Sequence, residues 1–491
     1  MAGAAVMVVE ISANRLLAPL FGNSIYTWTA LIGVILVSIS IGGYLGGWLA
    51  DKRSDFGLLG WLLAGAGIMT LLIPAIHSLL GQSSGTSSLI MGPLVVSVVL
   101  FAIPGVLLGA VSPASVRLYS KLQSDTHVGF AAGTISMVGS LGSFVGTFAS
   151  GFYLLGAFGV KSIFLGSGIL LILLAGVAFW LETKKPLDQI PVWISALIAG
   201  TIGSISNVAA QENVIFEQES FYHKIRVVEQ GHGPFAQRYL ELDNTTEGGM
   251  EVESGDIVLG YQKFWQVPLL KSGMKVDRAL FLGAGAFGMP EAVSKKWPSA
   301  DVEVVEIDPN VIEVGKRFFK LSEFPRVTAH ADDARRFLRL TASDKKYDMI
   351  FGDAYNGVQA IPVHLASQEF FQLVEDRLSP TGIFVMNVIS AVEGEKAALL
   401  AGMITTLKEV FPHVAVCASH LSRRQAQNVI LVASQDNWEP LFMKMEYTPG
   451  SLEDQLTQGY VPELRLPKGG VVFTDDHNPV DAIIARGLRL D

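Results

Sequence analysis

Residues 280–308 read LFLGAGAFGMPEAVSKKWPSADVEVVEID, and this stretch predicts the fold of the second half of the chain. The apolar run 279–282 predicts a buried strand that ends in the glycine-bearing turn 283–288. Residues 289–296 are expected to form a helix, and residues 302–307 a second buried strand. A strand, a glycine turn, a helix and a second strand followed by carboxylates are typical of a ligand-binding α/β domain.

The glycine turn indicates a class of ligand. Glycines allow the backbone to approach a bound group closely, and the following helix presents free N–H groups at its N-terminus. An acidic residue about 20 residues further on is placed to meet the hydroxyls of a ribose. Both dinucleotides and S-adenosylmethionine (SAM) use this arrangement, and the turn alone does not separate them. A packed turn without a ligand is the remaining alternative.

The first 210 residues differ in composition from the rest. Of the 491 residues 50% are hydrophobic and 16% are charged, and the mean hydropathy is +0.41, whereas about 25% of residues are charged in soluble domains. Membrane-spanning segments are therefore expected. Beyond Ala210 lie 28 of the 36 Lys and Arg residues and 39 of the 45 Asp and Glu residues. The C-terminal half is therefore predicted to be soluble and acidic, without nucleic-acid binding.

Cysteine and histidine usage argues against a metal site. The single cysteine, Cys417, excludes an intramolecular disulfide and a cysteine-built metal site. No HExxH or comparable spacing occurs in the sequence. We therefore predict no metal.

Seven apolar stretches are long enough to cross a bilayer: 2–20, 26–50, 57–80, 88–112, 129–154, 158–181 and 190–210. The first contains Glu10, Asn14 and Arg15, which should face protein or water rather than lipid, either in a functional cavity or in a structural polar network. Close helix packing is predicted by glycine pairs at 42 and 46, 43 and 47, and 142 and 146.

Loop charges and the expected ligand disagree about orientation. Six basic residues lie on one side of the predicted topology, against Lys161 on the other: Lys52, Arg53, Arg117, Lys121, Lys184 and Lys185. The positive-inside rule puts those loops in the cytoplasm, which leaves the soluble half outside if the seventh stretch crosses. Because SAM is made in the cytosol, we expect a multi-pass protein of the cell (inner) membrane with its soluble half in the cytoplasm, against the charge rule.

The soluble half shows two patterns. Short alternating runs broken by turn residues over 214–266 predict a small antiparallel β-domain. After Asp308 helices at 309–319, 333–340, 366–378 and 394–411 alternate with strands at 326–330, 347–352, 382–388, 413–418 and 427–434. This alternation predicts a doubly wound sheet with its ligand at the carboxyl ends of the strands. The expected fold class is a multi-pass α-helical membrane domain (1–210) plus a Rossmann-like α/β domain of the SAM-dependent methyltransferase type (276–491), preceded by a small β-domain (214–270).

Acidic residues gather at those carboxyl ends. Glu306 and Asp308 end the second strand, Asp332 and Asp333 follow the third, and Asp353 follows the fourth. A single such carboxylate is usually an N-cap or a solvated loop residue. Acids after three successive strands instead indicate contact with a ligand.

These segments resemble the polyamine aminopropyltransferases, the spermidine synthase family, and especially its membrane-fused branch. The resemblance covers roughly 215–434 and rests on the β-domain followed by GAGAFG, VVEID, ADDA and GDAYNG in this order. It implies SAM or decarboxylated SAM as a substrate, with Glu306 at the ribose hydroxyls and Asp333 at the adenine amino group. The backbone of Gly283 and Gly285 would line the methionine-derived tail.

The resemblance also implies a catalytic group. Asp353 matches the family's catalytic aspartate, which receives a proton from the attacking amine. Positions that border the family's substrate pocket are matched by Tyr222, Asp243, Tyr261 and Gln262. We expect Tyr222 and Tyr261 to assist Asp353, and Gln262, Asp308 and Asp332 to contribute to cofactor binding. A homodimer is implied as well.

The sequence departs from the family at four positions. Ala286 stands where the family's turn has an aspartate, and Asn356 replaces a second acid of the catalytic loop. Lys263 replaces the acid of a YQE or YHE motif, and Glu247 the glutamine of LDxxxQ. A diamine is a dication that needs carboxylates at both ends, so putrescine is expected to be a poor acceptor.

The implied chemistry is displacement at the carbon next to a sulfonium. We expect a membrane-anchored transferase of polyamine biosynthesis that releases methylthioadenosine. A second hypothesis is that the carboxylate of intact SAM attacks its own γ-carbon, which yields methylthioadenosine and homoserine lactone. A SAM-dependent methyltransferase and a non-enzymatic SAM-sensing membrane protein or transporter are further alternatives.

One C-terminal motif has two interpretations. Residues 474–479, TDDHNP, resemble a motif of the membrane-fused branch. They are expected either to close over the site or to form an Asx-turn ahead of a final helix.

Overall fold

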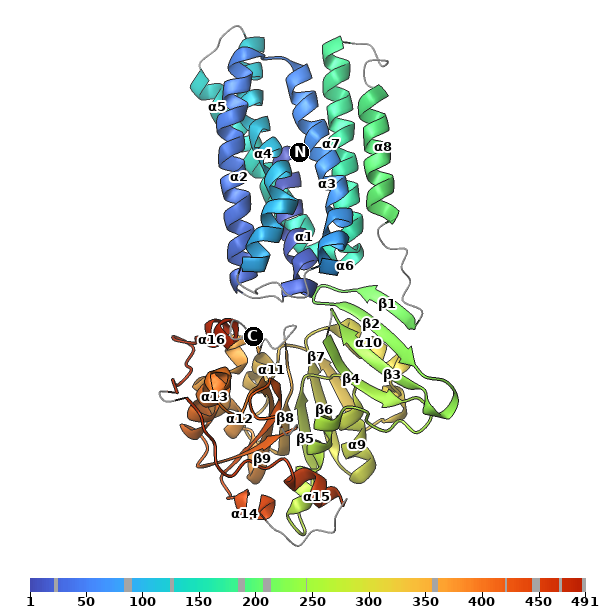
Figure 1. Ribbon diagram of the computed structural model, residues 1–491, viewed down its shortest axis with the longest axis vertical. Helices are drawn as coiled ribbons and strands as arrows, with labels where there is room; N and C mark the ends of the chain where they lie inside the picture. Colours follow the sequence, from blue (N-terminus) through green and yellow to red (C-terminus); the bar gives the residue numbers. More distant parts are fainter. Residues whose placement is uncertain are drawn as a thin grey trace. The chain divides into compact units, whose positions relative to one another are not determined.

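The computed structural model describes residues 1–21, 25–83, 91–123, 128–183, 190–205, 213–243, 245–355, 361–419, 422–443, 451–467 and 470–487 (Figure 1). The chain divides into two compact units. One comprises Met1–Glu212 and Glu219–Phe221, and the other comprises Asn213–Gln218 and Tyr222–Asp491. Each unit has hydrophobic clusters of its own.

The first unit is helical. Its helices are α1 (Ala2–Phe21), α2 (Ile25–Lys52), α3 (Phe56–Ser83), α4 (Met91–Leu122), α5 (Val128–Ala149), α7 (Val160–Thr183) and α8 (Ile190–Ile205). A π-helical turn, η1 (Ser150–Leu154), and the short α6 (Leu155–Ala157) continue α5. Within the described ranges, 6 helices are long and apolar enough to cross a membrane. The seventh predicted stretch is described as far as Ile205 and forms a 16-residue helix, shorter than the other six.

Glycines set the packing of α2 on α4 and of α1 on α5. A Cβ on Gly46 would lie 2.5 Å from the Cα of Ala110, and one on Gly146 would lie 2.5 Å from the carbonyl oxygen of Ala4. The predicted close packing is thus confirmed at these positions. It is wrong for Gly43 and Gly47, because no atom of the described residues lies within 4 Å of the position that a Cβ would take there.

The polar residues of α1 lie against protein. Asn14 is buried, and Glu10 and Arg15 are half-buried. The expectation that these groups avoid lipid is confirmed for Asn14 and stays a prediction for Glu10 and Arg15.

The second unit begins with a four-stranded sheet in the order β1-β2-β3-β4. Its strands are β1 (Val214–Glu219), β2 (Lys224–Gln230), β3 (Gln237–Leu242) and β4 (Thr245–Glu251), and β3 is antiparallel to both β2 and β4. The 3₁₀ turn η3 (Gly233–Phe235) separates β2 from β3, and the longer 3₁₀ segment η4 (Gly260–Leu270) leads to the main sheet.

The main sheet has seven strands in the order β10-β11-β9-β8-β5-β6-β7. They are β5 (Arg278–Leu282), β6 (Asp301–Glu306), β7 (Val327–Ala331), β8 (Tyr347–Gly352), β9 (Leu378–Ser390), β10 (His413–Ala418) and β11 (Gln427–Ser434). Strands β7, β6, β5, β8 and β9 are parallel, whereas β11 is antiparallel to both β9 and β10. The predicted doubly wound sheet is confirmed.

Helices cover both faces of this sheet (Figure 1). On β5, Ala279 and Phe281 face one hydrophobic cluster, together with α9 (Gly288–Lys296) and α10 (Pro309–Phe318). Leu280 and Leu282 face the other, together with α11 (Ala334–Leu340), α12 (Gln368–Glu375) and α13 (Ala398–Lys408). The remaining elements are η5 (Leu321–Glu323), η6 (Val363–Leu365), η7 (Glu395–Ala397), α14 (Glu439–Phe442), α15 (Leu452–Thr457) and α16 (Val480–Gly487).

One buried acid in α9 makes the stability of this unit depend on pH. Glu291 is 2% exposed, and its Oε1 has no hydrogen-bond partner among the described residues. Burial raises the pKa of Glu291 to about 8. A carboxyl group with a higher pKa in the folded chain binds its proton more tightly there, so the free energy of unfolding falls as pH rises from about 4.5 to about 8.

We therefore expect Glu291→Gln to raise the midpoint of thermal unfolding at pH 9 and to change it little at pH 4.5. The gain at pH 9 should correspond to about 1–3 kcal/mol, because the buried carboxylate charge is removed. The exposed Glu409, changed to Gln, is the matched control and should show no such dependence. An equal effect of Glu291→Gln at both pH values would contradict the assignment.

Candidate active site

Two cavities open at the carboxyl ends of the main sheet, where the strand order reverses between β5 and β8. Cavity A is lined by His223, Leu242, Glu247, Gly283–Gly285, Val305–Ile307, Asp332–Ala334, Asp353–Tyr355, Pro362, His364 and Leu365. Cavity B is lined by Thr245–Glu247, Leu259–Tyr261, Lys263, Asp353, Tyr355, Asn387, Ile389, Ser419 and Asn428. The two cavities share Glu247, Asp353 and Tyr355. The carboxyl groups of Glu247 and Asp353 therefore line both cavities.

The glycine turn after β5 is held between two other segments. Gly283 has φ +98°, and a Cβ there would lie 2.8 Å from the carbonyl carbon of Asp353. Gly285 has φ +48°, and a Cβ there would lie 2.9 Å from the carbonyl oxygen of Glu247. The glycines thus bring the turn against the main chain of the two residues whose carboxyl groups are shared by the cavities.

Glu306, at the end of β6, is tied to the glycine turn. Its Oε2 accepts a hydrogen bond from the N–H of Ala284 at 3.1 Å, and its Oε1 accepts one from the N–H of Asp308 at 3.0 Å. Burial raises the pKa of Glu306. The carboxylate lines cavity A with lone pairs left for a ligand's hydroxyls.

Asp332 and Asp333, after β7, line the same cavity. Asp333 caps α11 by accepting from the N–H of Arg336 at 2.8 Å, and its other oxygen lies 2.8 Å from Nε2 of His364. Asp332 pairs with the Arg336 guanidinium at 2.5 Å. Both acids therefore combine a structural contact with a position at the cavity wall.

Asp353, after β8, is anchored at both oxygens. Oδ1 accepts from Nδ2 of Asn387 at 2.8 Å, and Oδ2 accepts from the hydroxyl of Tyr261 at 2.9 Å. Burial raises the pKa of Asp353 to about 6, although these two hydrogen bonds lower it. The carboxyl group is therefore largely ionised at neutral pH, oriented, and open to both cavities.

Glu247 is a second acid at the junction. Burial, together with the negative charge of Asp353, raises the pKa of Glu247 to about 7. In the sequence Glu247 is identified only as a replacement for the glutamine of the family's LDxxxQ motif. Nothing in the pattern of β3 and β4 predicts that it lies opposite the glycine turn. In the structure its main chain lies against Gly285, next to Ala286, which offers no charge.

A buried histidine completes the wall of cavity A. Nδ1 of His223 lies 3.0 Å from Oδ2 of Asp243. Burial by itself would lower the pKa of His223, but the hydrogen bond and the negative charge of Asp243 raise it. Asp243, expected to border the substrate pocket, thus acts on the cavity through His223, which no motif in the sequence indicates.

Besides Asp243, three predicted site residues lie outside the sets that line the cavities. Asp308 is fully buried and caps α10 through the N–H of Asn310. Tyr222 is 41% exposed between β1 and β2. Gln262 is buried, with Nε2 3.7 Å from the position of a Cβ on Gly285, and its Oε1 has no partner among the described residues. Their roles in binding or catalysis stay predictions, as does that of Asn356, which lies outside the described residues.

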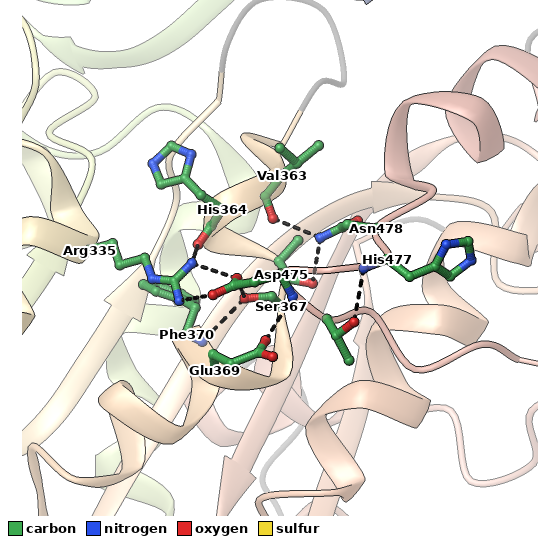
Figure 2. Close-up of polar contacts among 11 residues, drawn as sticks. Arg335, Val363, His364, Ser367, Glu369, Phe370, Asp475, His477 and Asn478 are labelled. Atoms are coloured by element: carbon green, nitrogen blue, oxygen red, sulfur yellow. Dashed lines mark hydrogen bonds and ion pairs between the residues drawn. The ribbon is translucent and has the colours of Figure 1, made fainter.

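The C-terminal motif braces the η6 segment, which contributes to the lining of cavity A (Figure 2). The carboxylate of Asp475 accepts hydrogen bonds from both terminal nitrogens of the Arg335 guanidinium, at 2.7 and 2.5 Å. It also accepts one from the hydroxyl of Ser367 at 2.7 Å. Arg335 also donates to the carbonyl oxygen of His364 at 3.2 Å. These contacts fix the short segment whose Pro362, His364 and Leu365 line the cavity.

The same motif forms a turn ahead of α16. The N–H of His477 donates to the hydroxyl of Thr474 at 3.0 Å, and Nδ2 of Asn478 donates to the carbonyl oxygen of Val363 at 2.8 Å. The expectation of a turn is confirmed. The motif reaches the site through the η6 segment and contributes none of the residues that line cavity A.

Strand order, glycine turn and acids at the strand ends together define a Rossmann-like α/β domain of the SAM-dependent methyltransferase type. Residues 267–440 match the family model described as "Spermine/spermidine synthase domain". This domain is therefore similar to the spermine/spermidine synthases, in agreement with the resemblance seen in the sequence.

Three individual proteins are similar to parts of this chain. The polyamine aminopropyltransferase of Vibrio vulnificus is 31% identical over 188 residues, which cover 37% of this chain and 60% of the relative. The eEF1A lysine and N-terminal methyltransferase of Bos taurus is 31% identical over 141 residues, which cover 27% of this chain and 20% of that protein. The chain thus spans less than two thirds of the length of either relative. A crystal structure of a probable spermidine synthase from Corynebacterium glutamicum aligns with a TM-score of 0.42 and 20% identity over 53% of this chain and 95% of that one.

The brace of the η6 segment leads to a prediction. Asp475→Asn removes the negative charge that holds Arg335, so the His364 segment should lose its fixed position. We expect the affinity for methylthioadenosine, measured by calorimetry on the full chain, to fall about three- to tenfold. Asp476→Asn, at the exposed neighbouring position, is the matched control. Equal affinities of the two variants would show that the brace does not support the binding site.

Proposed function

We propose that this protein is a membrane-anchored aminopropyltransferase that uses decarboxylated SAM and releases methylthioadenosine. The observation that carries the proposal is the position of Asp353, which lines both cavities with its two oxygens held by Asn387 and Tyr261. A donor in cavity A and an acceptor in cavity B would meet at this carboxylate. The similarity to polyamine aminopropyltransferases supports the same reaction class.

Cavity A suits an adenosyl sulfonium. In this proposal Glu306 accepts hydrogen bonds from the ribose hydroxyls, and the adenine lies next to the Asp333–His364 pair; all three residues line cavity A. The donor carries a positive sulfonium and an ammonium on its propyl tail. Glu247 supplies a negative charge beside the turn. The buried Gln262, whose Nε2 lies near Gly285, has an unpartnered Oε1 that is a further acceptor.

In the proposed reaction Asp353 is the proton acceptor. The nitrogen of a neutral amine attacks the propyl carbon bonded to sulfur, so a C–N bond forms while the C–S bond breaks and its electron pair stays on sulfur. The proton released from nitrogen passes to the Asp353 carboxylate, which also orients the nucleophile. Anchoring by Asn387 and Tyr261 keeps the carboxylate in line with both partners.

Asp353→Asn should reduce turnover by a factor of about 10²–10⁴, because an amide cannot accept the proton. Binding of methylthioadenosine should change less than about threefold, since the nucleoside contacts Glu306 and Asp333. In the unchanged protein kcat/KM should rise through the pH range of about 6 to 7, where Asp353 and Glu247 ionise. The amine itself loses its proton only near pH 10. Retained turnover in Asp353→Asn, or no inflection near pH 6–7, would contradict the role.

A second candidate function is the cleavage of intact SAM to methylthioadenosine and homoserine lactone. The observation that favours it is the packing of Ala286. Its side chain is 2% exposed, and a Cβ on Gly248 would lie 2.7 Å from its Cβ, so this position holds no acid to select the decarboxylated tail. The donor would then keep its carboxylate.

Product identification separates these functions. The purified full chain is incubated with SAM or decarboxylated SAM, with and without amines, and all products are identified by mass spectrometry. Aminopropyl transfer predicts methylthioadenosine only with decarboxylated SAM and an amine. Methylthioadenosine from SAM alone would establish cleavage, and S-adenosylhomocysteine would establish a methyltransferase. With no product in any mixture, a sensor or transporter role would replace the enzymatic one.

The proposal also concerns the location and the assembly of the protein. The long apolar helices support a location in the cell membrane. A cytoplasmic catalytic unit, contact with lipid and a homodimer stay predictions from the sequence.

A further inference from the structure

Cavity B has charges of opposite sign among its lining residues. It measures about 430 Å³. Asp353 and Glu247 are its only carboxylates among the described residues, and both lie at the junction with cavity A. Lys263 lines cavity B but not cavity A, and it is the only basic side chain among the described residues that line cavity B.

Lys263 differs from two other half-buried lysines in its ion pairing. In the part of the chain that the structure describes, no carboxylate forms an ion pair with its ammonium group, whereas Lys224 and Lys271 pair with Glu217 and Asp436. Lys263 is half-buried, and burial lowers its pKa. An anionic group of a ligand gains the most binding free energy next to a partly desolvated cation that has no carboxylate partner.

The remaining polar groups of cavity B are neutral. Nδ2 of Asn428 donates to Oδ1 of Asn387 at 3.1 Å, and Asn387 in turn donates to Asp353. Thr245, Thr246 and Ser419 add hydroxyl groups to the lining. These side chains can bind a polar ligand, but none of them offset the charge of a second ammonium, which would meet Lys263 instead.

We propose that the acceptor of the transfer is an amine with an anionic group at its far end, an ω-amino carboxylate rather than a diamine. This inference rests on the proposed aminopropyl transfer. The amine nitrogen would lie at Asp353 and Glu247, and the carboxylate would lie at Lys263. The transfer is the one described above, with the new C–N bond on the acceptor's amine, and the acceptor's carboxylate takes no part in bond making.

The test compares acceptors that differ only in the far group. The full-length protein in detergent receives decarboxylated SAM with a three- to six-carbon series of ω-amino carboxylates, of α,ω-diamines or of simple alkylamines. We expect kcat/KM for the best amino carboxylate to exceed that for the diamine of the same length by about tenfold or more, mainly through KM. The alkylamine should fall between them. Titration of the methylthioadenosine complex with the same compounds should give the same order of affinity without turnover.

Charge reversal assigns the preference to one residue. Lys263→Glu should invert the order, with the diamine preferred about tenfold, and Lys263→Gln should remove the discrimination. Lys275→Glu, at an exposed position outside both cavities, is the matched control and should behave like the unchanged protein.

The outcomes separate this inference from the proposed function. If diamines are the better acceptors and Lys263→Glu leaves that preference unchanged, the inference is wrong while aminopropyl transfer stands. If Lys263→Glu changes KM for the sulfonium donor and not the order of acceptors, Lys263 contacts the donor and the inference is again wrong. If no amine of any kind releases methylthioadenosine, the proposed transfer fails and the inference fails with it.

Discussion

The main chain of Gly283 lies against the main chain of Asp353, and the rest of the site depends on this contact. The N–H of Asp353 donates to the carbonyl oxygen of Leu282 at 2.8 Å, which continues the parallel pairing of β5 with β8. A Cβ at position 283 would overlap the Asp353 peptide, so only glycine lets the turn pass there. One backbone contact therefore sets the distance between the glycine turn of cavity A and the Asp353 carboxyl group that both cavities share.

The site concentrates buried negative charge. Glu306, Glu247 and Asp353 all have pKa values raised by burial, which means that the folded protein holds these carboxylates at a cost in free energy. A cationic sulfonium substrate would relieve this cost, because its charge stabilises the ionised forms. The same acids would make the empty site less stable as pH rises. Binding and stability are thus coupled through the same groups.

The sequence predicted the parts of this structure that depend on local pattern. Strands β5 to β8 are short runs, and each is followed by a turn or an acid. The sequence pattern therefore predicted their order along the chain and the position of Glu306, Asp333 and Asp353 at the strand ends. Residues brought in from distant segments were not. Asn387 comes from β9, His364 from the segment after β8 and His223 from the β-domain, and no periodicity links them to the glycine turn.

Three expectations from the sequence differ from the structure. Glu247 counted as the loss of a glutamine in the sequence, yet the hairpin β3–β4 places it beside Asp353, where it adds a charge. Asp308 comes two residues after Glu306, the last residue of β6, but its carboxylate forms the N-cap of α10 and is fully buried. Seven long apolar stretches predicted seven spans, whereas within the described residues the last one forms a helix of only 16 residues.

An experimental structure of the full chain with bound methylthioadenosine tests the central claim most directly. The account predicts the nucleoside in cavity A, with the ribose hydroxyls on the carboxylate of Glu306, the adenine next to Asp333 and the sulfur facing Asp353. A nucleoside bound elsewhere, or a cavity A that stays empty at saturating ligand, would contradict it.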